Sequence, residues 1–260
     1  MNVKDLLPII QGSFLVWRRN ATVFSRHFTV NIVPPFLEPL LYLGAIGFGI
    51  GMFVNDVLGM PFVVFIAPGI FAGSVMFASF YECAYGTYVR MYYQKTFDAI
   101  LATPLTLREV IIGEILWGAT RGLLSACVFY LVLVLLGLVP VLNGLICLPL
   151  AFLAGITFSA IAACFSAITP SIDALSYPST LYVSPMFLFS GTFFPISVLP
   201  EAVQIGAFAL LPLAHLVALA RSLMTGLPDP IWALNLLWLI AAAIIATTVA
   251  IKLFERRLIV

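Results

Sequence analysis

Charged residues are scarce in this chain of 260 residues, and their scarcity narrows the classes of function. Asp, Glu, Lys and Arg together make up 9% of the residues, and only three of the twelve basic residues are lysines. A phosphate-binding loop of the GxxxxGKS or GxxxxGKT type is absent, so the chain does not hold ATP by that device. The formal net charge of +1 leaves no basic face for nucleic-acid phosphates, so no nucleic-acid partner is expected.

Cysteine and histidine are also rare, which argues against metal sites and hydrolytic chemistry. No CxxC spacing connects the four cysteines, so neither a disulfide nor a metal site is expected. The two histidines, His27 and His215, belong to no visible Ser/His/Asp set or HExxH helix. A catalytic role is therefore not predicted.

Apolar residues are abundant and predict a single all-α membrane domain over residues 1–260. They make up 63% of the chain, whereas soluble domains contain about 45–50%. A membrane-spanning helix needs about 20 apolar residues. Six segments reach that length: Ile32–Phe53, Phe62–Tyr85, Val110–Leu138, Leu145–Ile168, Ala174–Phe194 and Ile231–Ile251.

The distribution of basic residues predicts the orientation of these spans. Ten of the twelve lie in the first 26 residues, between Arg90 and Arg108, or between Lys252 and Arg257. Because cytoplasmic loops retain Lys and Arg, both termini and the central loop are expected in the cytoplasm.

The first 30 residues predict an amphipathic cytoplasmic segment ahead of a six-helix domain at 31–260. Leu6, Ile10, Phe14 and Trp17 recur at helical spacing, which is typical of a helix lying in the membrane interface. A simple anchor and a functional contact are both compatible with this pattern.

The central loop predicts a short cytoplasmic helix. Phe97, Ile100, Leu101 and Leu105 fall on one helical face, and Thr103-Pro104 ends that helix. Thr106 and Glu109 then form a capping box that begins the next helix. The pattern alone favours a plain amphipathic connector over a functional element.

The segment from Val198 to Leu213 is apolar but too short to span the membrane. Pro195 precedes it, Pro200 and Pro212 interrupt it, and His215 follows. A segment of this length is typical of a re-entrant or interfacial element on the outer side.

Three charged residues lie within apolar segments: Glu38, Glu82 and Arg121. Embedded charges are costly and are usually paired or functional. Counting from the inner ends of their helices places Glu82 and Arg121 at similar depth, which predicts an ion pair between them. A structural role is favoured, although proton-carrying carboxylates would instead suit a proton-driven carrier.

A tyrosine stripe on the second span is a candidate substrate surface. Tyr81, Tyr85 and Tyr88 recur on one helical face, where rings with hydroxyl groups suit a saccharide or a lipid headgroup. The aromatic belt of the membrane interface is the favoured alternative explanation.

Several separated motifs together resemble the permease subunits of type-2 ABC exporters, over nearly the whole chain. The greatest similarity is to the nodulation-type lipo-oligosaccharide and polysaccharide export permeases. The motifs are Val16-Trp17-Arg18-Arg19-Asn20, Ala102-Thr103-Pro104-Leu105-Thr106, the run Ser184 to Pro195, Leu199-Pro200 and Leu211-Pro212-Leu213-Ala214-His215.

This resemblance implies a homodimer in a bacterial inner membrane, driven by a separate dimeric ATPase that binds ATP and Mg. The chain itself would carry no cofactor. Phe97 to Leu105, including Asp98, Thr103 and Pro104, would be the coupling helix, with Phe97, Ile100 and Leu101 exposed to fill a groove on the ATPase. Ile196 to Leu213, including Glu201, would be the outer re-entrant segment. The substrate would be a lipid-linked saccharide or lipo-oligosaccharide, and a multidrug permease is the alternative.

Overall fold

The computed structural model describes residues 3–26, 28, 37, 40–54 and 56–258, which are helical almost throughout. The long helices are α1 (Val3–Arg26), α3 (Phe62–Tyr81), α5 (Leu107–Leu135), α6 (Val141–Ile168) and α11 (Trp232–Leu258). The shorter α-helices are α4 (Thr96–Leu101), α7 (Ser176–Pro178), α8 (Ser184–Phe189), α9 (Glu201–Leu210) and α10 (Pro212–Thr225).

Tighter and wider helical turns join or extend these helices. The π-helical turns are η1 (Leu43–Gly49), η3 (Glu82–Gly86), η4 (Val89–Tyr93) and η6 (Ser179–Val183). The 3-10 turns are η2 (Ile50–Met52), η5 (Asp173–Leu175) and η7 (Ile196–Val198). Strands β1 (Asp56–Val57) and β2 (Met60–Pro61) form a small antiparallel hairpin.

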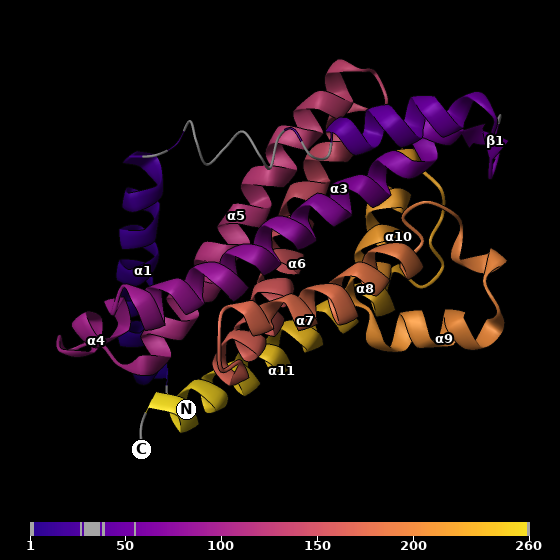
Figure 1. Ribbon diagram of the computed structural model, residues 1–260. Helices are drawn as coiled ribbons and strands as arrows, with labels where there is room; N and C mark the ends of the chain where they lie inside the picture. Colours follow the sequence, from indigo (N-terminus) through magenta and orange to yellow (C-terminus); the bar gives the residue numbers. More distant parts are fainter. Residues whose placement is uncertain (1–2, 27, 29–36, 38–39, 55, 259–260) are drawn as a thin grey trace.

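The molecule is elongated, and its two ends differ (Figure 1). One end, called the α4 end here, holds α4, the N-terminal end of α1 and the C-terminal end of α11. The opposite end, called the hairpin end, holds the β1–β2 hairpin and α9. The helices α3, α5, α6 and α11 run between the two ends, and α1 lies across the direction of α3 and α5 while packing on α5.

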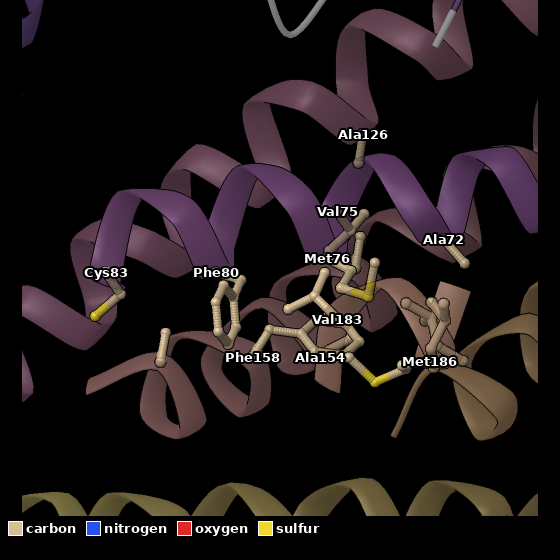
Figure 2. Packing of buried hydrophobic residues seen from close by; sticks show 14 of the residues in the cluster. Ala72, Val75, Met76, Phe80, Cys83, Ala126, Ala154, Phe158, Val183 and Met186 are labelled. Carbon is tan, nitrogen blue, oxygen red and sulfur yellow. The ribbon is translucent and has the colours of Figure 1, made fainter. Parts of the chain in front are cut away.

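Helix α3 lies at the centre of the bundle. Its most apolar stretch is 78% buried inside the protein, against 28% for that of α11. Figure 2 shows Met76 and Phe80 of α3 directed towards Phe158 of α6 and towards Val183 and Met186 of the following helical run. Because neighbouring helices bury α3 on several sides, apolar residues occupy most of its circumference, and it has little amphipathic character.

Small residues allow α3, α5 and α6 to approach closely. A methyl group at Gly118 would collide with Ser159, and one at Gly122 would collide with Ser79. The absence of a side chain at these two glycines therefore allows close helix packing.

Four helices among the described residues are long and apolar enough to cross a membrane: 62–93, 107–135, 141–168 and 232–258. The predicted first span, Ile32–Phe53, falls partly outside the described residues, and its described part is an apolar helix over Leu40–Met52. The predicted fifth span, Ala174–Phe194, is shorter than expected, because the continuous helix ends at Phe189 and Gly191 follows with a positive φ of 76°. The predicted boundary at Phe194 was therefore wrong.

The prolines before the last span break the chain into two helices. Pro200 precedes α9 and Pro212 begins α10, and the axes of the two helices meet at 94° around Leu211. Because proline lacks the N–H that would continue a helix, Pro212 begins a new helix rather than extending α9. The pair has the length of a broken span or of a re-entrant loop.

Candidate functional site

The predicted contact between Glu82 and Arg121 is confirmed. The Nε atom of Arg121 lies 3.4 Å from Oε2 of Glu82, with the two side chains 13% and 19% exposed. Oε1 of Glu82 accepts hydrogen bonds from Arg90 and from the Trp117 indole, each at 2.9 Å. The turn η3 and helix α5 are thus joined by the Glu82–Arg121 ion pair and by the hydrogen bond from Trp117 to Glu82.

Arg90 is the centre of this cluster, which the sequence analysis missed. Its Nη1 contacts Glu82 at 2.9 Å and its Nη2 contacts Glu114 at 2.6 Å. Glu114 is 1% exposed and also accepts from Thr87 at 2.9 Å. Glu114 lies inside the third predicted span and is therefore a fourth embedded charge. Its position in that span was the sequence signal for this cluster.

Helix α1 joins the same cluster through polar side chains. Asn20 donates to Glu114 at 2.8 Å and accepts from Arg19 at 2.9 Å. Trp17 donates its indole N–H to Thr120 of α5 at 2.8 Å. The α1 face that contains Trp17 and Asn20 is therefore fixed to the bundle, while Ile10 and Phe14 are exposed. This exposed face fits contact with lipid.

A cavity of about 400 Å³ opens beside the cluster, between α1, the turns η3 and η4, and α5. Arg121 lies over the Phe24 ring at 4.5 Å, and Phe24 packs edge-on against Trp117 at 5.5 Å. Tyr85 and Gln94 contribute further polar groups to the wall. The remaining wall residues are Arg19, Asn20, Val23, Glu82, Gly86, Val89 and Arg90.

The cavity wall is polar and carries a net positive charge. Three arginines against two glutamates, counting the adjoining Glu114, leave one net positive charge. Partial burial lowers the pKa of Arg19, and the neighbouring Glu114 carboxylate opposes that shift. No group of three His, Cys, Asp or Glu side chains that could hold a metal ion occurs among the described residues.

The three stripe tyrosines have different environments. Tyr81 is 40% exposed, and Tyr85 lines the cavity with its hydroxyl 3.5 Å from Ser179. Tyr88 is 1% exposed and donates its hydroxyl to the Pro170 carbonyl at 2.9 Å. Tyr88 is thus enclosed by the protein's own helices. In this conformation it does not offer the accessible substrate surface that the sequence predicts.

The structure confirms the turn predicted after α4, but it corrects the exposed surface predicted at Phe97. Thr106 and Glu109 form the capping box, and the helix before it ends at Leu101. Phe97, expected to be exposed, is fully buried against Phe254 of α11, with ring centroids 6.1 Å apart. An amphipathic pattern shows that one face is buried but not which surface buries it.

The opposite side of this segment is open to solvent. Asp98, Leu101, Thr103 and Pro104 are exposed, whereas Ile100 and Leu105 are half-buried. A partner that docks on α4 would therefore meet these four residues, and not Phe97.

The last turns of α11 hold the α4 end together. Glu255 pairs with Arg108 of α5 at 2.9 Å, beside the Phe254–Phe97 contact. Arg257 donates to the carbonyls of Ser166, Ala167 and Thr169 at 2.9 Å each, at the C-terminal end of α6. A cation there satisfies carbonyl groups that the helix leaves unbonded.

The hairpin end has an apolar cavity of about 620 Å³. Its wall includes Ile46, Phe187, Phe193 and Pro195. Glu201, at the start of α9, is exposed, and His215 is buried beneath α9. Glu38, the remaining predicted site residue, lies outside the described residues.

Comparison with known proteins identifies relatives across most of the chain. Residues 11–225 match the model of the family described as ABC-2 type transporter. The chain is 34% identical to "Nodulation protein J" of Sinorhizobium fredii, covering 94% of this chain and 93% of the relative. It is also 34% identical to "Nodulation protein J" of Rhizobium meliloti, covering 94% and 92%. "Inner membrane transport permease YadH" of Escherichia coli is 22% identical, covering 82% and 83%.

Proposed function

We propose the substrate, the direction of transport and the energy source of this chain, which belongs to the ABC-2 type transporter family and is thus a multi-pass membrane subunit of an ABC exporter. It carries a lipid-linked saccharide or lipo-oligosaccharide outward across a bacterial inner membrane. A separate ATPase dimer binds ATP and Mg and supplies the energy. The permease itself works as a homodimer and carries no cofactor.

The α4 end faces the cytoplasm in this proposal. Lys95, Arg108 and Lys252 belong to this end, and cytoplasmic segments retain such residues. Residues 1–30 then lie at the inner membrane surface, and 31–260 form a six-span domain. The helices at 40–52 and 173–189 supply the first and fifth spans. The α9–α10 pair enters the membrane from the outside and returns.

The exposed face of α4 is the docking site for the ATPase. The observation that carries this assignment is the two-sided environment of the helix. Phe97 anchors α4 to α11, while Asp98, Leu101, Thr103 and Pro104 remain exposed. A push on that face reaches α5 directly through the capping box and α11 through Phe254. Closure of the ATPase dimer would thereby move the helices that enclose the cavity.

The polar cavity receives the head of the cargo. Saccharide hydroxyl groups both donate and accept hydrogen bonds, and the wall offers guanidinium donors, the Gln94 amide and the Tyr85 hydroxyl. Aromatic rings of Phe24 and Trp117 supply apolar faces beside these groups. The apolar cavity at the hairpin end suits acyl chains.

The test uses the permease together with its ATPase in proteoliposomes. An N-acylated oligosaccharide with a fluorescent acyl chain should move only with ATP and should raise the rate of hydrolysis. Tyr85→Ala should lower this export at least several-fold, because it removes both ring and hydroxyl from the wall. Tyr85→Phe keeps the ring and is the matched control, with an intermediate loss.

Other outcomes would point elsewhere. Transport of hydrophobic cationic dyes without transport of the acylated oligosaccharide would favour a multidrug permease. Uptake driven by a pH gradient without any ATPase would contradict the exporter mechanism altogether.

A further inference from the structure

Three arginines line the polar cavity, and Arg19 differs from the other two in what it contacts. Arg90 contacts the carboxylates of Glu82 and Glu114. Arg121 contacts that of Glu82. Each oxygen of these two carboxylates already lies against a donor. Neither carboxylate is therefore left to neutralise Arg19 directly.

Asn20 separates Arg19 from the carboxylate of Glu114. Its Oδ1 accepts from Nη1 of Arg19 at 2.9 Å, while its Nδ2 donates to Oε1 of Glu114 at 2.8 Å. Nη2 of Arg19 lies 3.4 Å from Oγ1 of Thr96, the first residue of α4. Both partners of the guanidinium are thus neutral, and Arg19 makes no ion pair within the described part of the chain.

A cation in this position favours a negatively charged partner. Arg19 is half-buried on the cavity wall. Burial removes water from a charged group, and neutral acceptors compensate less of that loss than an anion does. A guanidinium carries five N–H groups, and the two bonds above occupy two of them. Donors of Arg19 thus remain for an oxygen ligand in the cavity.

The cavity has room for such a ligand and supplies further donors. Its volume is about 400 Å³. Gly86 keeps the wall open at Arg90, because a methyl group there would lie 3.1 Å from both terminal nitrogens of that guanidinium. The exposed Gln94 amide belongs to the same wall. The wall therefore combines a guanidinium that has only neutral partners with additional N–H donors, which is the chemistry that binds oxyanions.

We propose that Arg19 binds an oxyanion in this cavity, and that the head of the substrate carries a carboxylate or phosphate group. Arg19 is then the residue that distinguishes a charged head from a neutral one. The oxyanion would replace the 3.4 Å contact with Thr96, since a hydrogen bond between two charged groups is stronger than one to a hydroxyl. This inference rests on the proposed function, which assigns the cavity to the substrate head, and it adds the charge of that head.

The direct test measures binding and needs no transport. The permease–ATPase complex in neutral detergent, without nucleotide, is titrated with two fluorescent probes. One is an N-acylated oligosaccharide with a single sugar carboxylate, and the other is its uncharged methyl ester. The parent should bind the carboxylate probe about tenfold or more tightly than the ester. High salt should weaken binding of the carboxylate probe and leave that of the ester unchanged, because salt screens interactions between charges.

Variants of α1 assign this preference to one side chain. Arg19→Gln keeps a polar side chain but loses the charge, so it should bind both probes equally. Arg19→Lys keeps the charge without the planar donor geometry and should retain part of the preference. Arg18→Gln is the matched control, because Arg18 is exposed and lies outside the cavity wall, and it should retain the full preference. A parent-like preference in Arg19→Gln, or its loss in Arg18→Gln, would overturn the assignment. If Arg19→Gln fails to fold, Arg19→Lys and the salt dependence of the parent decide.

A phospholipid headgroup is the other source of the same oxyanion. The titrations are therefore repeated in nanodiscs of phosphatidylcholine, with and without phosphatidylglycerol. The preference for the carboxylate probe should be equal in both. A preference that disappears when phosphatidylglycerol is present would assign the site to lipid and overturn the inference about the substrate. Equal binding of both probes by the parent in every medium would overturn this inference alone, whereas binding of neither would overturn the proposed function as well.

Discussion

The two ends of the molecule hold their buried cations in different ways. At the α4 end, Arg90 and Arg121 contact the carboxylates of Glu82 and Glu114. At the hairpin end, Arg221 donates to the carbonyl of Gly191 at 2.6 Å and to that of Phe65 at 3.3 Å, with its guanidinium 4.0 Å from the Phe65 ring. The ion pairs between described residues all lie in the α4 half.

This difference means that the two ends constrain their helices through different kinds of contact. Side-chain ion pairs link helices through flexible arms, and Arg90 already divides its guanidinium between Glu82 and Glu114. Such pairs can exchange partners when α3 and α5 shift. Bonds to main-chain carbonyls instead fix a turn of the backbone, as Arg221 does at Gly191.

Removing Glu114 should produce the largest loss of stability. Glu114→Gln leaves Arg90 buried with only Glu82 as a carboxylate partner. Breaking a buried ion pair from one side costs about 3–5 kcal/mol. Thermal unfolding of the purified permease in detergent measures this loss. Glu201→Gln, on an exposed position of α9, is the matched control and should change little.

A charge-swap cycle sharpens the same point at the neighbouring pair. Glu82→Arg and Arg121→Glu should each impair folding or export, and the double variant should regain part of the loss. Additive damage in the double variant would mean that the 3.4 Å contact contributes nothing by itself.

Phe97→Ala should loosen α4 from α11 at a cost of about 3 kcal/mol, because it empties a fully buried aromatic site. The expected phenotype is ATP hydrolysis that continues while export falls, since the ATPase still meets the exposed face of α4. Leu101→Ala, on that exposed face, should instead weaken ATPase binding. Loss of ATPase binding in Phe97→Ala with normal coupling would reverse the two roles.

The contrast between Phe97 and Glu82 shows what the sequence could predict. Counting helical rise from the inner ends of two spans placed Glu82 and Arg121 at similar depth, and the capping box at Thr106 depends only on local sequence. Phe97 was misplaced because its covering residue, Phe254, comes from a distant helix. Periodicity identifies a buried face, but it does not distinguish a partner protein from the chain's own last helix.

The central role of Arg90 needed the three-dimensional structure for a similar reason. In the sequence it belongs to a basic group near the inner loop, which suggests solvent exposure. In the structure, π-helical turns begin at Glu82 and at Val89, and Arg90 reaches back into the bundle. Such turns change the face on which side chains emerge and are not visible in an apolar pattern.

Arg221→Met should have a smaller effect, about 1.5–3 kcal/mol, because it removes charge-assisted hydrogen bonds to carbonyls but leaves an apolar side chain over Phe65. The loss should be almost independent of salt, since no carboxylate pairs with this arginine among the described residues. Unfolding measured at low and high salt checks this expectation. A loss that shrinks strongly at high salt would indicate an ionic partner.

Arg257 tests the comparison most finely, because it lies at the α4 end but binds carbonyls as Arg221 does. Its Nη1 donates to three carbonyls at the end of α6. Its planar guanidinium also lies over the Tyr88 ring, 5.7 Å from the ring centroid. Arg257→Lys keeps the charge but loses this geometry, and we expect a loss of about 1 kcal/mol that salt does not alter. Arg108→Lys is the matched control at the exposed pair with Glu255, where the loss should be about 0–1 kcal/mol and should disappear in high salt. If both variants respond equally to salt, the distinction between carbonyl-bound and carboxylate-bound cations does not hold at this end of the molecule. If only Arg108→Lys responds, the end of α11 combines one adjustable contact with one fixed contact, and Arg257 keeps α6 in place while α4 and α5 move.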